Sequence, residues 1–489
     1  MPNNAIEGLA PATLWSRFFE ISQVPRPSKH EERIRLYLRN FAGKNNLEIK
    51  EDETGNIVIK VPPKPGFENS PTVILQSHVD MVCEKNKDKN HDFNNDPIVL
   101  VKDGNWIKAD GTTLGADNGI GAAAALAIAT DYTFNHGPLE LLFTVDEETG
   151  LTGANHLAKG FVEGKYLLNL DTEEDGCFYV GCSGGMDSVG TMKLEYEPAN
   201  ESFTPYLLFV SGLKGGHSGI NINDRRANAI RIIAQLLVRM NNFNYQLQSI
   251  TGGSKRNAIP REAEAALFID SADEAKLREL INEFTLETVL EFNETDPGIK
   301  ITFEKKDSAP GQQVYTKNFS TKIINTLLAL PHGVISMSPA ITGLVETSTN
   351  LATVTTENNF LRIGTSQRSS IESAKKNIAA SVKSVFDLAG AEVTVGDGYP
   401  GWQPNLESNI LKISKNTFKN IFGREPELKA VHAGLECGIL GDKYPGLEMI
   451  SFGPTIEGAH SPDERVNIHD VEKFYRLLKA IITALSKVK

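Results

Sequence analysis

The sequence predicts an α/β fold whose first domain is interrupted by an inserted α+β domain. A chain of 489 residues is too long for one hydrophobic core, so two or more domains are expected. Several short apolar runs are typical of strands buried in an open α/β sheet, and they end in acids or histidine. Near residue 185 this pattern changes, and near residue 399 it returns. We therefore predict a first domain from residues 1–185 and 399–489, with residues 186–398 inserted.

The first sixty residues predict two helices and a hairpin. Apolar side chains recur at helical spacing over residues 14–21 and again over 34–41. Pro25 and Pro27 separate the two segments, because proline interrupts helical hydrogen bonding. Residues 48–62 then alternate in polarity around a Gly-Asn turn, which predicts a hairpin.

A buried strand over residues 71–77 leads directly into His78-Val-Asp80. Residues two apart on an extended backbone face the same side, so Asp80 can reach the imidazole of His78. A carboxylate in that position fixes the tautomer of a metal-bound histidine. A His-x-Asp pair is a weak signal alone, and its position at a strand end favours a ligand.

Asp117 lies in a glycine-rich segment just before an Ala-rich helix predicted over residues 120–130. Two interpretations remain open from the local sequence. Asp117 can cap the helix, since aspartate is a preferred N-cap residue, or it can belong to a functional site.

The apolar run 139–145 predicts another buried strand, and it stops in Asp146, Glu147 and Glu148. Carboxylates crowded at the end of a buried strand are costly unless a cation neutralises them. A metal site resolves this cost, because one glutamate can ligate while its neighbour acts as a general base. The alternative is a solvated acidic loop.

A third strand, predicted over residues 166–170, ends at Asp171. In open α/β sheets, ligands bind beyond the carboxyl ends of the strands. His78, Glu147, Glu148 and Asp171 follow three such ends, which favours a shared metal site over unrelated surface acids.

The inserted segment predicts an α+β layer with a mainly antiparallel sheet. The C-terminal segment, residues 399–489, again has the pattern of an α/β fold and carries His460 just beyond a predicted strand. In the insert we expect strands near 204–211, 262–270, 299–304, 349–356 and 360–366, and helices near 224–240, 273–291, 315–328 and 370–388. In the C-terminal segment we expect helices over 405–421 and 468–487 and a strand near 447–452.

The composition argues against several classes of partner. The formal net charge is −12, from 62 acidic and 50 basic residues, so nucleic acid and anionic membranes are not expected to bind. The four cysteines form no Cys-x-x-Cys pair, no signal peptide is visible, and the longest apolar run is too short to cross a bilayer. A cytoplasmic protein is therefore expected.

Five ordered motifs together resemble the co-catalytic zinc peptidases, the family that includes carboxypeptidase G, carnosinase and bacterial dipeptidases. The likeness to the aminoacyl-histidine (Xaa-His) dipeptidases of this family extends over essentially the whole chain. The motifs are His78-x-Asp80, Gly115-Ala-Asp117-Asn-Gly, Asp146-Glu-Glu-Thr-Gly, Asn169-Leu-Asp171 and Gly458-Ala-His460-Ser. Further similar stretches surround His217, Asn257, Arg368 and Glu436.

The resemblance implies a zinc-peptidase catalytic domain with a mixed, mainly parallel sheet and an inserted lid or dimerisation domain. It implies two Zn²⁺ ions per subunit, which Co²⁺ or Mn²⁺ could replace. Asp117 would bridge the two ions. Glu148 and His460 would complete one site, and His78 and Asp171 the other.

The resemblance also implies the roles of the remaining residues. Glu147 would act as general base, Asp80 would orient His78, and His217 would help stabilise the oxyanion, in the same chain or across a homodimer. Substrate contacts would come from Arg368, Asn257 and Glu436. Arg368 could instead be a surface-strand arginine, and Glu436 a helix N-terminal acid.

We therefore expect a metal-dependent dipeptidase that hydrolyses small unblocked Xaa-His dipeptides, including β-alanyl-histidine. The alternatives are an N-acyl amino acid deacylase or a broader carboxypeptidase with the same two-metal site, and a metal-binding protein without catalysis. The remaining histidines that lack supporting motifs are interpreted as surface residues: His30, His91, His136, His156 and His469.

Overall fold

The computed structural model describes residues 5–307 and 311–488, and the chain divides into two compact units. The first unit runs to Cys182 and continues over Trp402–Ala430 and Leu435–Lys489. The second unit comprises Ser183–Gly401 and Val431–Gly434. The sequence of the second unit thus interrupts that of the first. The lid or dimerisation role of the second unit stays a prediction.

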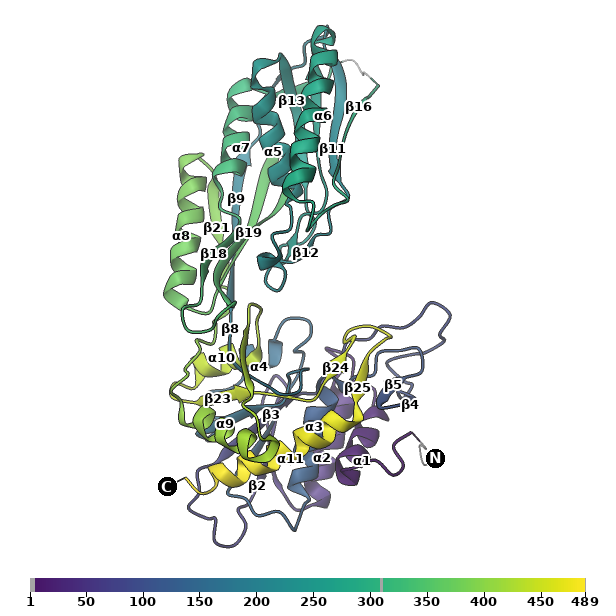
Figure 1. The fold of residues 1–489 in the computed structure, drawn as a ribbon, viewed down its shortest axis with the longest axis vertical. Helices are drawn as coiled ribbons and strands as arrows, with labels where there is room; N and C mark the ends of the chain where they lie inside the picture. Colours follow the sequence, from purple (N-terminus) through teal and green to yellow (C-terminus); the bar gives the residue numbers. More distant parts are fainter. Residues whose placement is uncertain (1–4, 308–310, 489) are drawn as a thin grey trace. The chain divides into compact units, whose positions relative to one another are not determined.

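The first unit is built on an eight-stranded mixed sheet in the order β1-β2-β6-β3-β7-β23-β8-β22. Figure 1 labels β2, β3, β8 and β23 among these strands. The neighbours β6 and β3, β3 and β7, and β7 and β23 are parallel, so their carboxyl ends share one edge. Every residue of β3, β6 and β7 is buried, which explains why their sequences are mostly apolar. This sheet confirms the predicted α/β fold. The strands are β1 (Glu48–Glu51), β2 (Ile57–Val61), β3 (Val73–His78), β6 (Leu139–Thr144), β7 (Tyr166–Asn169), β8 (Cys177–Cys182), β22 (Glu427–Val431) and β23 (Glu448–Ser451).

Helix α3 (Ala116–Ala129) is the buried helix of the first unit. It packs against β3 and α1, and small side chains allow that close approach. A separate antiparallel sheet, β24-β25-β5-β4, completes the unit. The other helices are α1 (Ala12–Ser22), α2 (Glu32–Lys44), α4 (Thr152–His156), α9 (Asn409–Phe422), α10 (Glu436–Lys443) and α11 (Ile468–Leu485). The small sheet contains β4 (Leu100–Asp103), β5 (Trp106–Ala109), β24 (Ile456–Glu457) and β25 (Arg465–Asn467).

The second unit contains a nine-stranded sheet with the path β16-β11-β15-β13-β19-β20-β9-β21, and β18 pairs with β19. All its pairings are antiparallel, as predicted for the insert. The strands are β9 (Gly184–Lys193), β11 (Thr204–Ser211), β13 (Tyr245–Gly252), β15 (Ala263–Ile269), β16 (Lys300–Lys305), β18 (Gly333–Met337), β19 (Val345–Glu357), β20 (Phe360–Ser369) and β21 (Glu392–Val395). Two short pairs accompany the sheet: β10 (Tyr196–Pro198) with β17 (Gln313–Tyr315), and β12 (Gly216–His217) with β14 (Ala258–Ile259).

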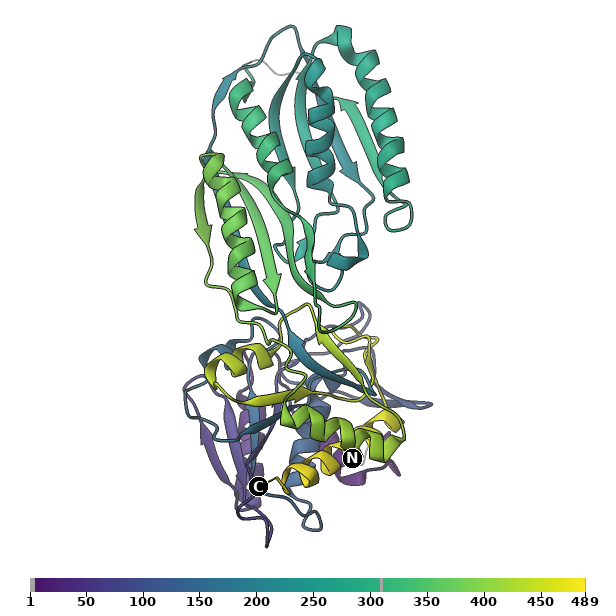
Figure 2. The ribbon, with the colours of Figure 1, turned by 60° about the vertical axis from the view of Figure 1, so that its left-hand side comes forward.

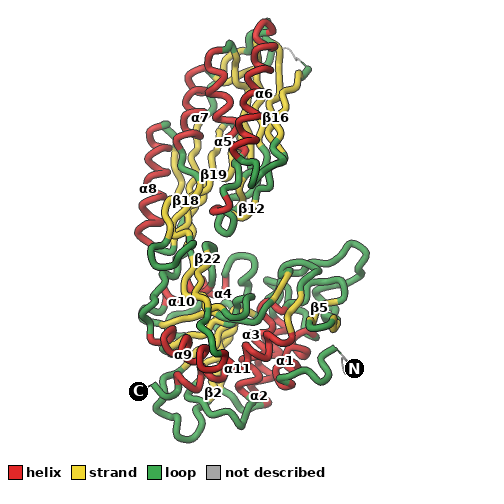
Figure 3. Tube along the Cα trace, viewed as in Figure 1, coloured by secondary structure: helices red, strands yellow, loops and turns green. Residues whose placement is uncertain are grey.

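Four long helices cover one face of this sheet, as Figure 2 and the helix colouring of Figure 3 show. They are α5 (Ala229–Arg239), α6 (Glu274–Glu291), α7 (Lys317–Ala329) and α8 (Glu372–Leu388). Short 3₁₀ turns occur at Ile222–Asp224, Met240–Asn242 and Ser271–Asp273.

The second unit consists of two halves with the same topology. In chain order, β11-α5-β13-β15-α6-β16 forms one β-α-β-β-α-β half, and β9-α7-β19-β20-α8-β21 forms the other. Within each half the four strands take the spatial order 4-1-3-2, and the halves join where β13 pairs with β19. The first half lies entirely within the chain connection between β9 and α7 of the second half.

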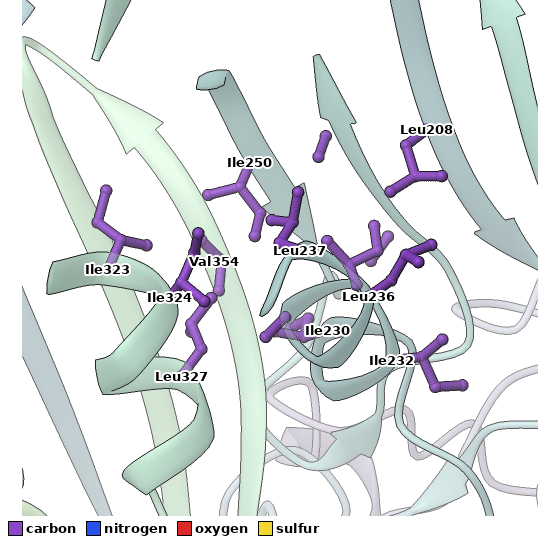
Figure 4. Close-up of a cluster of buried hydrophobic side chains, with 14 of the residues drawn as sticks. Leu208, Ile230, Ile232, Leu236, Leu237, Ile250, Ile323, Ile324, Leu327 and Val354 are labelled. Carbon is purple, nitrogen blue, oxygen red and sulfur yellow. The ribbon is translucent and has the colours of Figure 1, made fainter. Parts of the chain in front are cut away.

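One hydrophobic core runs across both halves (Figure 4). Ile230 and Leu237 on α5 pack in this core with Ile324 and Leu327 on α7, and Val354 of β19 lies among them. Removing such buried aliphatic side chains would leave cavities that cost about 2–5 kcal/mol each. None of the helices within 5–307 and 311–488 is long and apolar enough to span a membrane.

Two histidines predicted to be surface residues, His91 and His136, are buried instead. His136 is fully buried, and its Nδ1 lies 2.7 Å from the carbonyl oxygen of Gly137. Its Nε2 has no hydrogen-bond partner among the described residues. Burial lowers the pKa of His136 because a charged ring would be poorly solvated there.

Because burial lowers the pKa of His136, we expect the free energy of unfolding of the first unit to decrease in acid. The unfolded chain takes up a proton at His136 below its ordinary value of 6.5, and the folded unit resists that uptake. The contribution of neutral His136 to the free energy of unfolding is therefore complete above pH 6.5. It decreases as the pH falls below that value, by at most about 1.4 kcal/mol per pH unit. Trp15, Trp106 and Trp402 all lie in the first unit, so tryptophan fluorescence during urea unfolding would report on it.

The variant His136→Asn keeps an N–H donor near the Gly137 carbonyl and cannot titrate. Its unfolding midpoint is expected to depend less on pH between 6.5 and 5 than that of the wild type. Equal slopes in the two proteins would mean that His136 does not contribute to acid sensitivity.

Candidate metal site

His78 ends β3, and its buried imidazole is surrounded by carboxylates. Its Nδ1 lies 3.3 Å from Oδ1 of Asp80, and its Nε2 lies 3.0 Å from Asp117 and 3.3 Å from Asp171. Asp80 supports more than the histidine, because its two oxygens also accept the backbone N–H groups of Glu147 and Glu148 at 3.1 and 3.2 Å. One buried carboxylate therefore lies close to the His78 ring and binds the backbone of the two acids that follow β6.

Asp117 does not cap α3. The backbone is non-helical at Asp117 and Asn118, so the regular helix begins after them, and no described amide of that helix donates to the Asp117 carboxylate. The carboxylate instead lies between two histidines, with Oδ1 3.0 Å from Nε2 of His78 and Oδ2 3.2 Å from Nε2 of His460. The capping interpretation is wrong because long-range partners, which the local sequence does not reveal, determine this side chain.

Two groups of three potential ligands share Asp117. Within each group the ligand atoms lie within 4.8 Å of one another. The groups are His78, Asp117 and Asp171, and Asp117, Glu148 and His460. All five predicted ligands therefore come together in the first unit. Glu147 lies beside them, with one oxygen within the same distance of His78 and Glu148.

A tight turn after β6 presents Glu147 and Glu148. Asp146 adopts a left-handed backbone conformation with φ of 48°, which is uncommon for a residue other than glycine. Its carboxylate accepts hydrogen bonds from the hydroxyl groups of Thr149 and Thr152. Of the three acids at this strand end, Asp146 thus stabilises the turn, and the other two lie beside His78.

The charges of this cluster strongly perturb one another. Burial disfavours the charged ring of His78, but Asp171 and Asp117 raise its pKa well above the usual value. Hydrogen bonds to Asp117 and Glu148 raise the pKa of His460 to about 11. Burial raises the pKa of Asp171 to about 6 and that of Glu147 well above an ordinary glutamate. Such perturbation by burial and close charges is characteristic of functional sites.

The donor set fits two divalent cations. It contains only imidazole nitrogens and carboxylate oxygens, the ligands that zinc accepts in catalytic sites. Oε1 of Glu148 is buried and accepts no hydrogen bond from any residue in the described part of the chain. A cation would occupy such an oxygen and offset the mutual repulsion of the acids. Ligation by these five residues stays a prediction.

Glu436 begins α10 in the first unit and is almost fully buried. Its Oε2 accepts hydrogen bonds from Gln76 at 2.6 Å and Thr144 at 2.7 Å, and burial raises its pKa to about 7. Oε1 has no partner among the described residues. Glu436 is thus a helix N-terminal acid held behind the ends of β3 and β6, and its substrate contact is untested.

In the second unit, the backbone determines the tautomer of His217. Its Nδ1 accepts the N–H groups of Gly219 and Ile220 at 3.2 and 3.1 Å. Burial and the charge of Arg368 lower the pKa of His217 to about 4, so the ring is neutral at pH 7. With Nδ1 occupied as an acceptor, the single ring proton lies on Nε2, which is then a hydrogen-bond donor.

Arg368 is buried in β20, so the surface-strand interpretation is wrong. Its Nη1 donates to the hydroxyl of Tyr399 at 2.8 Å, and its Nη2 lies 3.4 Å from Nε2 of His217. Nη2 of Arg368 and Nε2 of His217 both carry protons, so neither nitrogen can accept a hydrogen bond from the other. An anion between them would accept from both.

Asn257 is exposed and lines a cavity of about 530 Å³ in the second unit, together with His217. Its carbonyl oxygen accepts the N–H of Ser218 at 2.8 Å. The backbone of Asn257 therefore supports the loop that carries His217, and contact of its side chain with a substrate is untested.

Sequence reasoning missed several polar residues that support these sites. Arg26 and Glu464 are buried in the first unit against the backbone of ligand-bearing segments. In the second unit, Tyr399 contacts Arg368, and the ring of buried His432 lies 2.7 Å from the hydroxyl of Ser348. No local motif marks Arg26, Glu464 or Tyr399, because their partners are distant in sequence and are often backbone atoms. His432 stands in the similar stretch that contains Glu436, and its role stays open from the sequence.

Comparison with known proteins gives consistent results. The model of peptidase family M20/M25/M40 matches residues 74–484. The chain is 39% identical to the cytosol non-specific dipeptidase of Escherichia coli strain K12, over 97% of this chain and 98% of that protein. The crystal structure of aminoacylhistidine dipeptidase from Vibrio alginolyticus matches with a TM-score of 0.91 and 41% identity, over 98% of both chains. Aminopeptidase PepT from Bacillus cereus shares the fold, with a TM-score of 0.57 and 17% identity over 98% of this chain and 100% of that one.

Proposed function

Because the chain belongs to peptidase family M20/M25/M40 and is a peptide hydrolase, we propose that it is a two-metal dipeptidase acting on unblocked Xaa-His dipeptides. The observation that carries the proposal is the pair of three-ligand groups that share Asp117, with Glu147 beside them. The relatives in E. coli and V. alginolyticus are both named as dipeptidases. The name of the V. alginolyticus protein specifies histidine, whereas that of the E. coli protein calls it non-specific, so the substrate range needs its own test.

We propose that Glu147 is the general base and that the five ligands hold two zinc ions. Bound there, the ions would activate a water molecule and polarise the scissile carbonyl. Glu147 is buried, and burial raises its pKa, which favours a group that takes a proton from water and later releases it to the leaving amine. Asp80 orients His78 and, through the backbone N–H groups, Glu147 itself.

The donors of the second unit support a substrate with a free carboxylate. The Nε2–H of neutral His217 and the Nη2 of Arg368 can each donate to an anionic group of the substrate. We propose that Arg368 contacts the carboxylate of the dipeptide and that His217 donates to the developing oxyanion. Contacts of Asn257 and Glu436 with the substrate, action of the protein as a homodimer and a cytoplasmic location are further parts of this proposal.

A panel of blocked and unblocked peptides tests the proposed function. The substrates are β-alanyl-histidine, alanyl-histidine, alanyl-leucine, and the N-acetylated and C-amidated forms of alanyl-histidine. Each is assayed before chelation, after chelation and after return of zinc, cobalt or manganese. We expect cleavage of the free Xaa-His dipeptides alone, loss of activity with chelator and recovery with zinc.

Other outcomes would change the proposal in defined ways. Cleavage of the acetylated peptide would assign a deacylase or broader carboxypeptidase activity to the two-metal site. Equal rates for alanyl-leucine and alanyl-histidine would remove the histidine preference. Activity that survives complete metal removal would refute the two-metal mechanism.

The variant Arg368→Lys is expected to raise KM for dipeptides by roughly 10–100-fold, the cost of about 1.5–3 kcal/mol for one hydrogen bond to a charged group. Lysine keeps the charge and loses the planar fork that suits a carboxylate. Arg362→Lys is the matched control, because Arg362 lies on the same strand, is half exposed and pairs with Glu357 at 3.4 Å. An unchanged KM in Arg368→Lys would exclude Arg368 as the carboxylate contact.

A further inference from the structure

The backbone just before Asp117 is bound by one buried carboxylate. Glu464 is only 2% exposed. Its Oε2 accepts the N–H groups of Leu114 and Gly115 at 2.7 and 2.9 Å, and its Oε1 accepts those of Ala116 and Asp117 at 2.7 and 3.3 Å. Four consecutive amides thus converge on one side chain that lies about 350 residues further along the chain.

Arg26 holds the same segment from its carbonyl side. Arg26 is also only 2% exposed, and its Nη1 donates to the carbonyl groups of Val79 and Asp80 at 3.0 and 2.7 Å. Its Nη2 donates to the carbonyl of Gly115. A Cβ atom at Gly115 would lie 2.5 Å from that nitrogen, and φ there is +69°, so the contact requires glycine.

Glu464 and His460 belong to the same short loop. The N–H of Glu464 donates to the carbonyl of Ser461 at 3.0 Å, and the N–H of Ser461 donates to that of Gly458 at 3.2 Å. The loop is therefore folded on itself, and displacement of the Glu464 carboxylate would be transmitted to His460. In this way Glu464 connects the backbone of one predicted ligand, Asp117, to the loop of another.

We propose that Glu464 is a positioning residue for the metal site formed by Asp117, Glu148 and His460. By binding the amides up to Asp117, it fixes the distance between that bridging carboxylate and His460. The other group shares Asp117, but its remaining ligands His78 and Asp171 lie at the ends of β3 and β7, so it depends less on this loop. The inference rests on the proposed two-metal function, and it adds a residue that touches no substrate or metal itself.

The variant Glu464→Gln tests this role with almost no change in shape. Its side-chain NH₂ group would face two backbone N–H groups, so a donor would replace an acceptor. We expect calorimetric titration of the metal-free protein with zinc to show one site within about threefold of wild type and one weakened roughly 10–100-fold, the usual effect of losing a group that supports a metal ligand.

Cobalt absorption spectra supply a second readout, because they report the coordination of each bound ion. The spectrum at two equivalents of cobalt is expected to change in Glu464→Gln, and excess metal is expected to restore kcat to within a few-fold. Glu464→Asp keeps the charge, and an intermediate affinity is expected. It also serves as the test protein if the glutamine variant does not fold.

Glu140→Gln is the matched control. Glu140 is equally buried, and its carboxylate accepts the N–H groups of Glu163 and Gly164 at 2.8 and 2.9 Å, near the amino ends of the strands. It should lower thermal stability without changing either metal affinity. Wild-type protein that binds fewer than two ions would refute the proposed function. This inference alone would be overturned if the wild type binds two ions and the Glu464 variants bind both ions with unchanged or equally weakened affinity.

Discussion

The Glu147→Gln variant is expected to retain both metal ions and to lose roughly 10²–10⁴-fold in kcat, the contribution of one positioned general base. Glutamine keeps the length and the hydrogen-bonding backbone of this residue, whose N–H donates to Asp80 at 3.1 Å. It cannot accept a proton at neutral pH. Loss of turnover with intact metal binding would therefore show that the variant lacks proton transfer and keeps the structure of the metal site.

Metal content and turnover must be measured on the same preparation of Glu147→Gln. Glu163→Gln supplies the control, because it makes the same chemical change at an exposed side chain of the same unit. Turnover within tenfold of wild type would remove Glu147 from the mechanism. Loss of a metal ion instead would identify it as a ligand, a role that its distance from His78 and Glu148 also allows.

The Asp117→Asn variant is expected to bind at most one ion and to lose at least roughly 10²–10³-fold in kcat/KM, the cost of removing one preorganised electrostatic stabiliser. Each oxygen of Asp117 faces a different histidine, at 3.0 and 3.2 Å. Asparagine has a single oxygen and no charge, so it can serve only one of the two ligand groups. Metal analysis after dialysis, followed by titration with zinc, would measure the change.

The matched control for Asp117→Asn is Asp52→Asn. Asp52 also lies in the first unit, where its carboxylate accepts the N–H groups of Thr54, Gly55 and Asn56 in the turn between β1 and β2. This variant should keep both ions and full activity. Two tightly bound ions in Asp117→Asn would show that the carboxylate does not bridge.

The predicted fold was confirmed where local pattern and tertiary burial agree. The strands β3, β6 and β7 are buried on both faces, and continuous apolar runs predict that arrangement. The strands β9 and β13 were missed. β9 begins with two glycines, and Gly190 within it lies against the ring of Phe386, a packing partner that the sequence does not reveal. β13 has only two buried residues and a bulge, so its alternation is weak.

The candidate site could be predicted because its side chains follow strand ends that the sequence reveals. His78 ends one buried strand and Asp171 closely follows another, and the parallel order of β3 and β7 brings them together. Glu464 gave no such signal, because its partners are backbone amides that every residue possesses. The role of Asp117 stayed open for a related reason, since only its distance from His460 distinguishes a shared ligand from a helix cap.

The nested topology of the second unit has a consequence for synthesis on the ribosome. Strands β11 to β16 form one contiguous half, so that half can fold as soon as residues 204–305 have emerged. β9 is made earlier, yet its partners β20 and β21 come much later, and Gly184 pairs with Ser369. Contacts between such distant segments form slowly, and exposed strand edges promote aggregation in the meantime. Until β20 is made, β9 therefore lacks both of its sheet partners, and only the intervening chain connects it to the folded inner half.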